Sequence, residues 1–200
     1  MPGNRRSIRL KNYDYTQQGA YYMTICAGDR KCVFGDVRDG EMVLNDAGMM
    51  VDKWWRELTS KYSMIKIDEY KIMPNHIHGI MMIVGNDGNN DVGADLCVRP
   101  DNGENIKHHD VVKGRTRDIK GQTRRSAPTP TIGTVIQWFK TMSTNEYIKN
   151  IKSKNWPAFN ARLWQRNFYE HIIRDESDLN RIREYIINNP ANWERDEYFQ

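Results

Sequence analysis

The sequence predicts an α+β fold in which helices pack on a central antiparallel sheet, with one long flexible insertion. The expected elements run strand, strand, helix, strand, strand, helix, strand, helix, so both types alternate along the chain. Two of the strands are joined tightly through Pro74-Asn75, as expected for neighbours in such a sheet. The chain has 200 residues, enough for one domain at 1–200 that includes an insertion.

The first third of the chain is expected to contain two strands and a helix. Residues 20–27 (AYYMTICA) favour a strand because β-branched and aromatic residues follow a Gln-Gln-Gly break. A short strand at Glu41–Leu44 follows the turn Asp39-Gly40. Asn45 or Asp46 should then cap a helix in which apolar residues recur at helical spacing. These residues are Met49, Met50, Trp54 and Leu58.

Two further strands are predicted at 65–73 and 76–84. The second is apolar on both faces beyond its histidines, which is typical of a central strand. Periodicity then disappears, and Gly, Asn, Asp and charged residues dominate from 85 to 130. This insertion is predicted to be either disordered or an arm that contacts phosphates through its cations. The cations are Lys113, Arg115, Arg117, Lys120, Arg124 and Arg125.

The C-terminal part is expected to form a helix, a strand and a second helix. Helical spacing returns at 132–139 and continues loosely to 151. After Pro157, the latter half of residues 164–174 favours a strand. The last helix should start near 175–177 and end before Pro190, since a residue that precedes proline is disfavoured in helical conformation.

Charge and cysteine content restrict the class of protein. The net charge of +4 is compatible with nucleic-acid binding without being diagnostic of it. The three cysteines are odd in number and lack metal-ligand spacing, so we expect reduced thiols. No apolar run approaches the length of a membrane span, and the N-terminus lacks a signal-peptide core. A cytoplasmic protein with no membrane partner is therefore the default expectation.

A pair of histidines opens the strand at 76–84. His76 and His78 are two residues apart, so in a strand both side chains point to one face while Ile77 points to the other. Imidazole is the commonest nitrogen ligand of metals in proteins. Two neighbouring imidazoles therefore predict half of a metal site.

A tyrosine and an asparagine lie one turn apart on the last predicted helix. Tyr185 and Asn189 share a face that Ile182 and Ile186 border, so both polar groups should turn toward the protein. From the spacing alone, Tyr185 could be a core tyrosine with a satisfied hydroxyl, and Asn189-Pro190 could simply end the helix. Both the structural and the functional interpretation remain open at this point.

Three ordered segments resemble the transposases that use one catalytic tyrosine. They are KIMPNHIHGIMMI, LWQRNFYEHIIR and LNRIREYIINNP. The likeness is greatest to the REP-associated tyrosine transposases of the HUH endonuclease superfamily, named for a histidine–hydrophobic–histidine motif that residues 76–78 match. YYMTICAGDRKCVFGDV and TIGTVIQWFKTMSTNEYIKNI also fit, so the resemblance covers nearly the whole chain except the insertion.

The resemblance implies a ferredoxin-like sandwich with the two histidines on a central strand. It also implies a divalent metal, Mg²⁺ or Mn²⁺, held by His76, His78 and a polar residue one turn beyond the nucleophilic tyrosine. The matching positions in this sequence are Tyr185 as nucleophile and Asn189 as third ligand. Tyr147 is a rival, but Ile151 stands four residues after it and cannot bind metal.

The implied activity is a metal-dependent single-stranded DNA endonuclease and strand transferase. Attack by the tyrosine would give a covalent 5′-phosphotyrosine intermediate, which a 3′-hydroxyl can reverse without ATP. The implied partner is single-stranded DNA, as imperfect hairpins with flanking guide bases. The resemblance leaves open whether the protein is a monomer or a homodimer.

Two groups of residues are candidates for DNA contact. The N-terminal arm is basic and precedes two tyrosines, although a solvated tail explains it equally well. The second group, at 164–171, could contact DNA near the site, and one member, Trp164, could equally belong to the core. The candidates are Arg5, Arg6, Arg9, Lys11, Trp164, Gln165, Arg166 and His171.

Two other functions compete with transposition. A domesticated relative would bind REP-like hairpins without mobilising them. An unrelated metal hydrolase would combine the histidines with carboxylates such as Asp68 or Glu69, and it would leave the Tyr185–Asn189 pairing unexplained.

Overall fold

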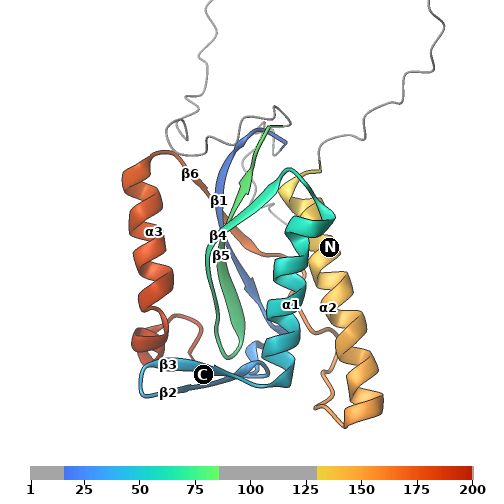
Figure 1. Ribbon diagram of the computed structural model, residues 1–200. Coiled ribbons are helices and arrows are strands. Elements are labelled where there is room, and N and C mark those ends of the chain that lie inside the picture. The colour runs from blue at the N-terminus through green and yellow to red at the C-terminus, as the bar shows by residue number, and fades with distance from the viewer. Residues whose placement is uncertain (1–15, 86–129, 200) are drawn as a thin grey trace, which may run out of the picture.

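The structure is a computed structural model that describes residues 16–85 and 130–199. Its main elements are β1 (Gly19–Cys26), β2 (Gly35–Arg38), β3 (Glu41–Leu44), α1 (Asp46–Lys61), β4 (Ile65–Ile72), β5 (His76–Ile83), α2 (Ile132–Lys154), β6 (Tyr169–Ile173) and α3 (Glu176–Asn188) (Figure 1). Two short 3₁₀-helices are η1 (Gly28–Arg30) and η2 (Pro190–Arg195). The predicted basic arm, with Arg5, Arg6, Arg9 and Lys11, lies outside the described residues, as do residues 86–129 of the predicted insertion.

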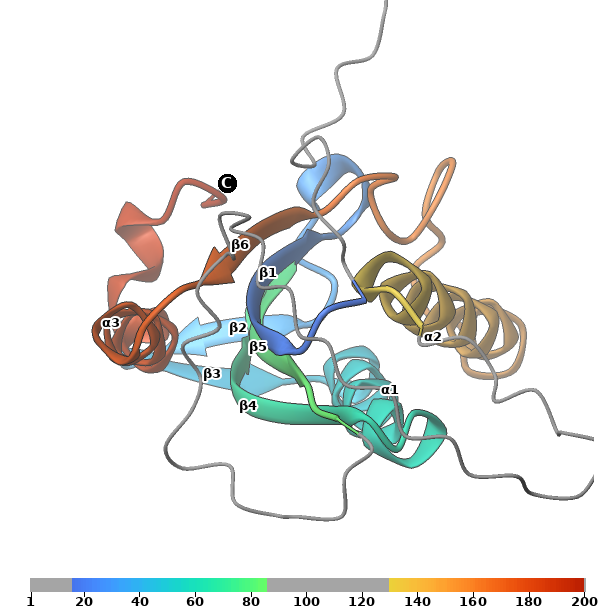
Figure 2. The same ribbon diagram turned by 90° about the horizontal axis from the view of Figure 1, so that it is seen from above.

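Four strands form the central antiparallel sheet in the order β4-β5-β1-β6. Within the order β1-α1-β4-β5-α2-β6, this arrangement is ferredoxin-like. Helices α1 and α2 lie on one side of the sheet and α3 lies on the other (Figure 2). The predicted α+β class is therefore confirmed, as is the central position of the strand that carries the two histidines.

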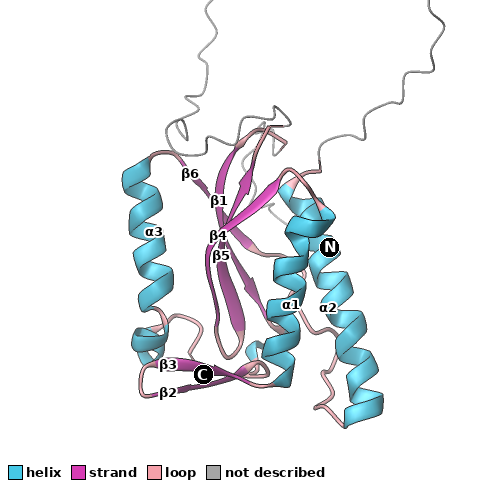
Figure 3. Ribbon diagram, viewed as in Figure 1, coloured by secondary structure: helices cyan, strands magenta, loops and turns pink. Residues whose placement is uncertain are grey.

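One strand was not predicted from the sequence. β2 pairs with β3 in a separate two-stranded ribbon, joined by Asp39 and Gly40 at φ angles of 52° and 77°. Two consecutive residues at positive φ are the signature of the hairpin turn that Asp-Gly favours. The predicted turn was therefore correct, but it connects two strands. This ribbon lies at the same end of the molecule as the C-terminal segment (Figure 3).

The two faces of the sheet have different cores. Alternate residues of β1, such as Tyr21 and Met23, pack with α1 and α2, whereas Ala20 and Tyr22 belong to the cluster around α3. The same alternation along β5 places His76 and His78 on the face shared with Ile80, which packs against α3. The histidines therefore face the helix that carries Tyr185.

The core face of α1 differs in part from the predicted one. Asn45 caps the helix, accepting the Gly48 N–H at 2.9 Å, and Met50 and Leu58 are buried as the spacing predicts. Met49 is exposed, and the fully buried tryptophan is Trp55, which follows the partly buried Trp54. The bulky residue nearest the sheet is therefore one position later than expected.

Gly79, which follows the second histidine, gives Trp55 the space to pack on the sheet. A Cβ at Gly79 would lie 2.6 Å from Cζ2 of Trp55 and 3.2 Å from Cβ of Tyr70. Because the indole is fully buried, it has little freedom to move away. We expect Gly79→Ala to lower the free energy of unfolding by about 1–3 kcal/mol in urea titrations. Gly85→Ala is the control, since the three atoms nearest its Cβ all belong to the end of the flexible Gln18 side chain. Equal stability of both variants would contradict this account.

No helix within residues 16–85 and 130–199 is both long and apolar enough to cross a membrane.

Candidate metal centre and tyrosine site

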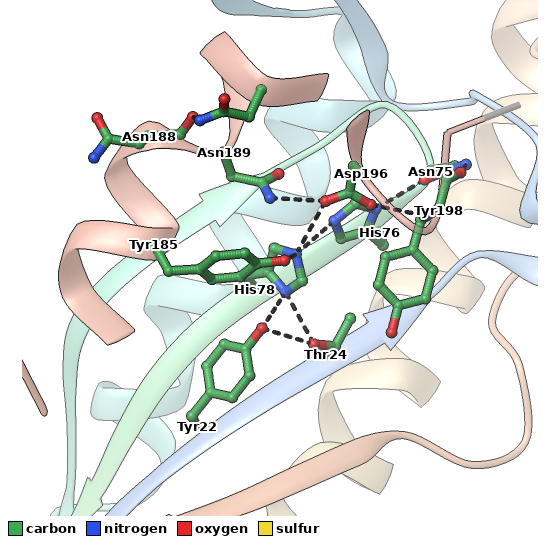
Figure 4. Close-up of polar contacts among 11 residues, drawn as sticks. Tyr22, Thr24, Asn75, His76, His78, Tyr185, Asn188, Asn189, Asp196 and Tyr198 are labelled. Carbon is green, nitrogen blue, oxygen red and sulfur yellow. Dashed lines mark hydrogen bonds and ion pairs between the residues drawn. The ribbon is translucent and has the colours of Figure 1, made fainter. Parts of the chain in front are cut away.

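His76 and His78 form the centre of a buried polar cluster between β5 and α3. Both side chains are almost completely buried, and their Nε2 atoms are 2.9 Å apart (Figure 4). Burial is the main cause that lowers the pKa of each imidazole, and the neighbouring His78 lowers that of His76 further. Both rings are therefore neutral near pH 7, which is the form that binds metal.

The hydrogen bonds of Asn75 determine which nitrogen of His76 carries the proton. The Asn75 amide nitrogen donates to the carbonyl oxygens of Arg30 at 2.9 Å and Tyr198 at 2.8 Å. Its oxygen is therefore the atom that faces Nδ1 of His76, at 2.8 Å, and Nδ1 must be the donor. The lone pair of His76 is then on Nε2, directed toward His78.

His78 is held in the same way by β1. Its Nδ1 lies 2.8 Å from the Tyr22 hydroxyl and 2.9 Å from Oγ1 of Thr24. Because the Thr24 hydroxyl donates to Tyr22 at 3.1 Å, its oxygen is available to accept a hydrogen bond from Nδ1–H of His78. With the proton on Nδ1 of each ring, both histidines direct an unprotonated Nε2 toward a shared point, and the hydrogen bond at Nδ1 orients the ring, as in metal sites.

The distance between these two nitrogens fits a shared cation. Two lone pairs that face each other repel, and a positive ion between them removes the repulsion. Two ligands at right angles on one ion, each at about 2.1 Å, are about 3 Å apart. The observed separation of 2.9 Å matches this value.

Asp196 supplies a carboxylate to the same cluster. Its Oδ2 lies 4.0 Å from Nε2 of His78, and one potential ligand atom from each of His76, His78 and Asp196 lies within 4.8 Å of the others. Burial raises the pKa of Asp196, but interactions with His78 and Asn189 outweigh it and lower the pKa overall. These three residues form a candidate metal site with an ionised carboxylate.

Asn189 lies beside Asp196 with one atom unpaired. Its amide nitrogen donates to Oδ2 of Asp196 at 2.8 Å, and the side chain is buried. Its Oδ1 is also buried and has no hydrogen-bond partner among the described residues. A buried carbonyl oxygen without a partner is destabilising unless something else satisfies it. A cation is suited to do so, which fits the ligand role that the resemblance implies for Asn189.

Tyr185 reaches the cluster from the preceding turn of α3. Its hydroxyl lies 3.4 Å from Nε2 of His78, and the side chain remains 44% exposed. Burial, followed by the charges of Asp196 and Glu197, raises the pKa of Tyr185 to about 12. The hydroxyl is therefore protonated at neutral pH and lies where an exposed substrate can meet the cluster.

The alternative nucleophile Tyr147 and the alternative ligand Asp68 form hydrogen bonds outside the histidine cluster. Tyr147 is buried in α2, and its hydroxyl donates to the carbonyl oxygen of Pro157 at 3.0 Å. Asp68 accepts from Nε of Arg183 at 2.8 Å, and this hydrogen bond lowers the pKa of the carboxyl group. In the described part of the chain, the carboxylate grouped with the histidines is that of Asp196. This argues against a site built on Asp68 or Glu69.

Asp196 was not among the residues predicted from the sequence. It follows Asn189 by seven positions, beyond the proline that ends α3, and η2 returns the chain to the histidines. A carboxylate in an irregular C-terminal segment follows no helical or strand periodicity. The sequence offers no more than a segment with charged residues after Pro190, which does not single out Asp196 as a ligand.

The residues predicted to contact DNA lie in different places. Trp164 is buried in the core on the α1 and α2 side, and its indole N–H donates to Oγ of Ser143 at 2.9 Å. This burial makes Trp164 a packing residue. Gln165 and Arg166 line a shallow hollow beside α2. Among the candidates within the described residues, His171 is the one that lies beside Tyr185, in a hollow that both residues line.

Comparisons with known proteins extend over nearly the whole chain. No family model matches the sequence. An uncharacterised protein of Haemophilus influenzae is 36% identical over 196 residues, which span 98% of this chain and 93% of that protein. A second protein of that organism, provisionally assigned to the REP-associated tyrosine transposases, is 24% identical over 187 residues, spanning 91% of this chain and 77% of that protein. A solved structure of a REP-associated tyrosine transposase bound to a REP hairpin has a TM-score of 0.51 at 14% identity, covering 96% of this chain and 74% of that one.

Proposed function

We propose that this chain, which has the fold of the REP-associated tyrosine transposases, is a member of that single-tyrosine HUH family and that it cuts and rejoins single-stranded DNA. The observation that carries the proposal is the Tyr185 hydroxyl at 3.4 Å from Nε2 of His78, beside a candidate metal site. The proposed substrates are imperfect DNA hairpins with flanking guide bases. The solved relative of the same fold, which was bound to a REP hairpin, supports this substrate class.

The proposed cofactor is a divalent cation, Mg²⁺ or Mn²⁺. His76 and His78 would hold it through Nε2, with Asp196 and the unpaired oxygen of Asn189 as further ligands. Such an ion supplies charge neutralisation at the scissile phosphate. Two imidazole ligands favour Mn²⁺ over Mg²⁺, because Mn²⁺ is the softer ion. Compared with the neutral set implied by the resemblance, Asp196 adds one negative charge to the site.

In the proposed cleavage step, the oxygen of Tyr185 forms a bond to phosphorus while the bond from phosphorus to the upstream 3′-oxygen breaks. The tyrosine proton passes to water, which reaches this side chain because it is 44% exposed. The departing 3′-oxygen takes a proton and becomes a 3′-hydroxyl. The downstream strand stays joined to Tyr185 through its 5′-phosphate. Because one phosphodiester replaces another, the same step run backward by a second 3′-hydroxyl rejoins DNA.

The experiment uses labelled single-stranded hairpins taken from the flanks of the gene, incubated with the protein and Mn²⁺ or Mg²⁺. An SDS-resistant protein–DNA adduct that EDTA prevents is the expected result. Hairpin binding without an adduct or cleavage would instead indicate a DNA-binding relative that no longer mobilises DNA. Cleavage without an adduct would indicate a hydrolase that uses water.

The role of Asp196 gives a separate prediction. We expect Asp196→Asn to weaken Mn²⁺ binding about 10- to 100-fold in calorimetric titrations without DNA, because the site loses its anionic ligand. Asp178→Asn is the matched control, since the carboxylate of Asp178, in α3, pairs with His171 and Arg181 and is not part of the candidate metal site. Unchanged Mn²⁺ affinity in Asp196→Asn would show that the carboxylate only orients Asn189.

A further inference from the structure

A hollow of about 510 Å³ opens beside Tyr185, between the sheet and α3. We call it the tyrosine hollow, since Tyr22 of β1, Tyr169 of β6 and Tyr185 of α3 all line it. Thr24 and Ile182 also line it. Its volume lies in the range typical of small-ligand sites. In Figure 4 the hydroxyl groups of Tyr22 and Tyr185 both point toward His78, so this hollow adjoins the candidate metal site.

The three tyrosine rings are arranged around the central one. The ring of Tyr22 lies 6.1 Å from that of Tyr169 and 6.3 Å from that of Tyr185, edge-on in both cases. Tyr169 and Tyr185 are 52% and 44% exposed, although both are large aromatic residues. Exposed aromatic faces beside a cavity are the feature by which proteins hold unpaired bases of single-stranded nucleic acids.

The charges around the tyrosine hollow favour an uncharged ring over a phosphate as its occupant. Arg181 lines the hollow, but it forms an ion pair with Asp178, and His171 contacts the same carboxylate at 2.7 Å. Glu197, which also lines the hollow, adds a negative charge. The described lining thus contains no cation without a carboxylate partner. A base fits this environment better than the phosphate to which it is attached.

The geometry of cleavage indicates which base of the substrate would occupy the tyrosine hollow. In an in-line displacement the attacking and departing oxygens lie on opposite sides of phosphorus. The upstream nucleotide leaves on the side away from Tyr185, whereas the downstream nucleotide stays bonded to the phosphate that Tyr185 attacks. A cavity lined by the ring of Tyr185 is therefore closer to the downstream nucleotide.

We propose that the tyrosine hollow binds the base of the first nucleotide downstream of the cleaved bond, with Tyr169 as its stacking partner. This inference rests on the proposed function. This base would be held both before cleavage and while its 5′-phosphate is bonded to Tyr185. Holding the downstream end prevents its displacement while a new 3′-hydroxyl arrives. Tyr169 is thus a substrate-binding residue for the strand that is transferred.

The test combines Tyr169 variants with hairpins that lack one base, either the first downstream or the first upstream of the cleavage site. Loss of base–aromatic stacking should reduce kcat/KM for adduct formation by about 10-fold in Tyr169→Ala. Tyr169→Phe keeps the ring and should stay within about twofold of wild type. With the downstream base removed, Tyr169→Ala should cause no further loss. With the upstream base removed, the full loss from Tyr169→Ala should persist.

A second readout does not depend on cleavage. In a Tyr185→Phe background, 2-aminopurine at the first downstream position should lose fluorescence on binding, and Tyr169→Ala should restore it. Tyr169→Ala losses that are independent of the downstream base, together with unchanged fluorescence, would overturn this proposal while leaving the proposed function intact. Absence of any adduct with the wild-type protein would overturn the proposed function, and this proposal with it.

Discussion

Replacement of Tyr185 by phenylalanine is expected to abolish the covalent protein–DNA adduct and to reduce strand cleavage by on the order of 10³-fold or more. The substitution removes only the hydroxyl that lies 3.4 Å from Nε2 of His78. The ring contacts with Tyr22 and His78 remain, so the fold and hairpin binding should be unchanged. Denaturing gels with labelled hairpins measure the adduct and the cleaved strand in one experiment.

Tyr147→Phe is the matched control for that loss. Tyr147 also belongs to a helix, but its hydroxyl bonds to the backbone of Pro157 and has no place in the polar cluster. Adduct formation in this variant should equal that of the wild type. Cleavage that persists in Tyr185→Phe would assign the chemistry to water and reject the tyrosine as nucleophile.

The second large effect is expected at the histidines. We expect His78→Ala to abolish measurable Mn²⁺ binding and to reduce cleavage by on the order of 10²- to 10³-fold, since the site loses a metal ligand. EDTA treatment of the wild type should reduce cleavage to the same extent. Added Mn²⁺ should then restore cleavage by the wild type but not by His78→Ala. Calorimetry measures metal binding, and gel assays measure cleavage.

A control is needed because His78 is buried and its removal leaves a cavity. Lys71→Ala changes the residue paired with His78 across β4 and β5 but removes no ligand of the candidate site. Thermal unfolding followed by circular dichroism reports whether each variant is folded at the assay temperature. Cleavage by folded His78→Ala at the wild-type rate would exclude a catalytic role for the metal site.

The sheet and the histidine pair could be predicted because they depend on local patterns. A period of two along residues 76–83 places both imidazoles on one face, and the structure has them there. The four-residue spacing on α3 likewise predicted that Tyr185 and Asn189 would face the protein. In the structure the Tyr185 hydroxyl contacts His78, and the Asn189 amide nitrogen donates to Asp196.

Asp196 could not be predicted because its position depends on contacts between distant parts of the chain. Asn75 donates to the carbonyl oxygen of Tyr198, and this bond links two residues that are far apart in sequence. The bond fixes the segment after η2 near the histidines. Trp164 illustrates a different limit, since an indole is equally suited to a core or to a DNA surface, and only the packing with Phe34 and Phe139 distinguishes them.

The most direct test of the proposed chemistry is to identify the residue bonded to DNA by mass spectrometry of the nuclease-trimmed, trypsin-digested adduct. Trypsin should release residues 184–195, EYIINNPANWER, in which Tyr185 is the only tyrosine. We expect this peptide to carry the added mass of a 5′-linked nucleotide from the downstream strand. Nucleotide mass on a peptide that contains Tyr22, Tyr169 or Tyr198, with the 184–195 peptide unmodified, would contradict the assignment of Tyr185 as the nucleophile.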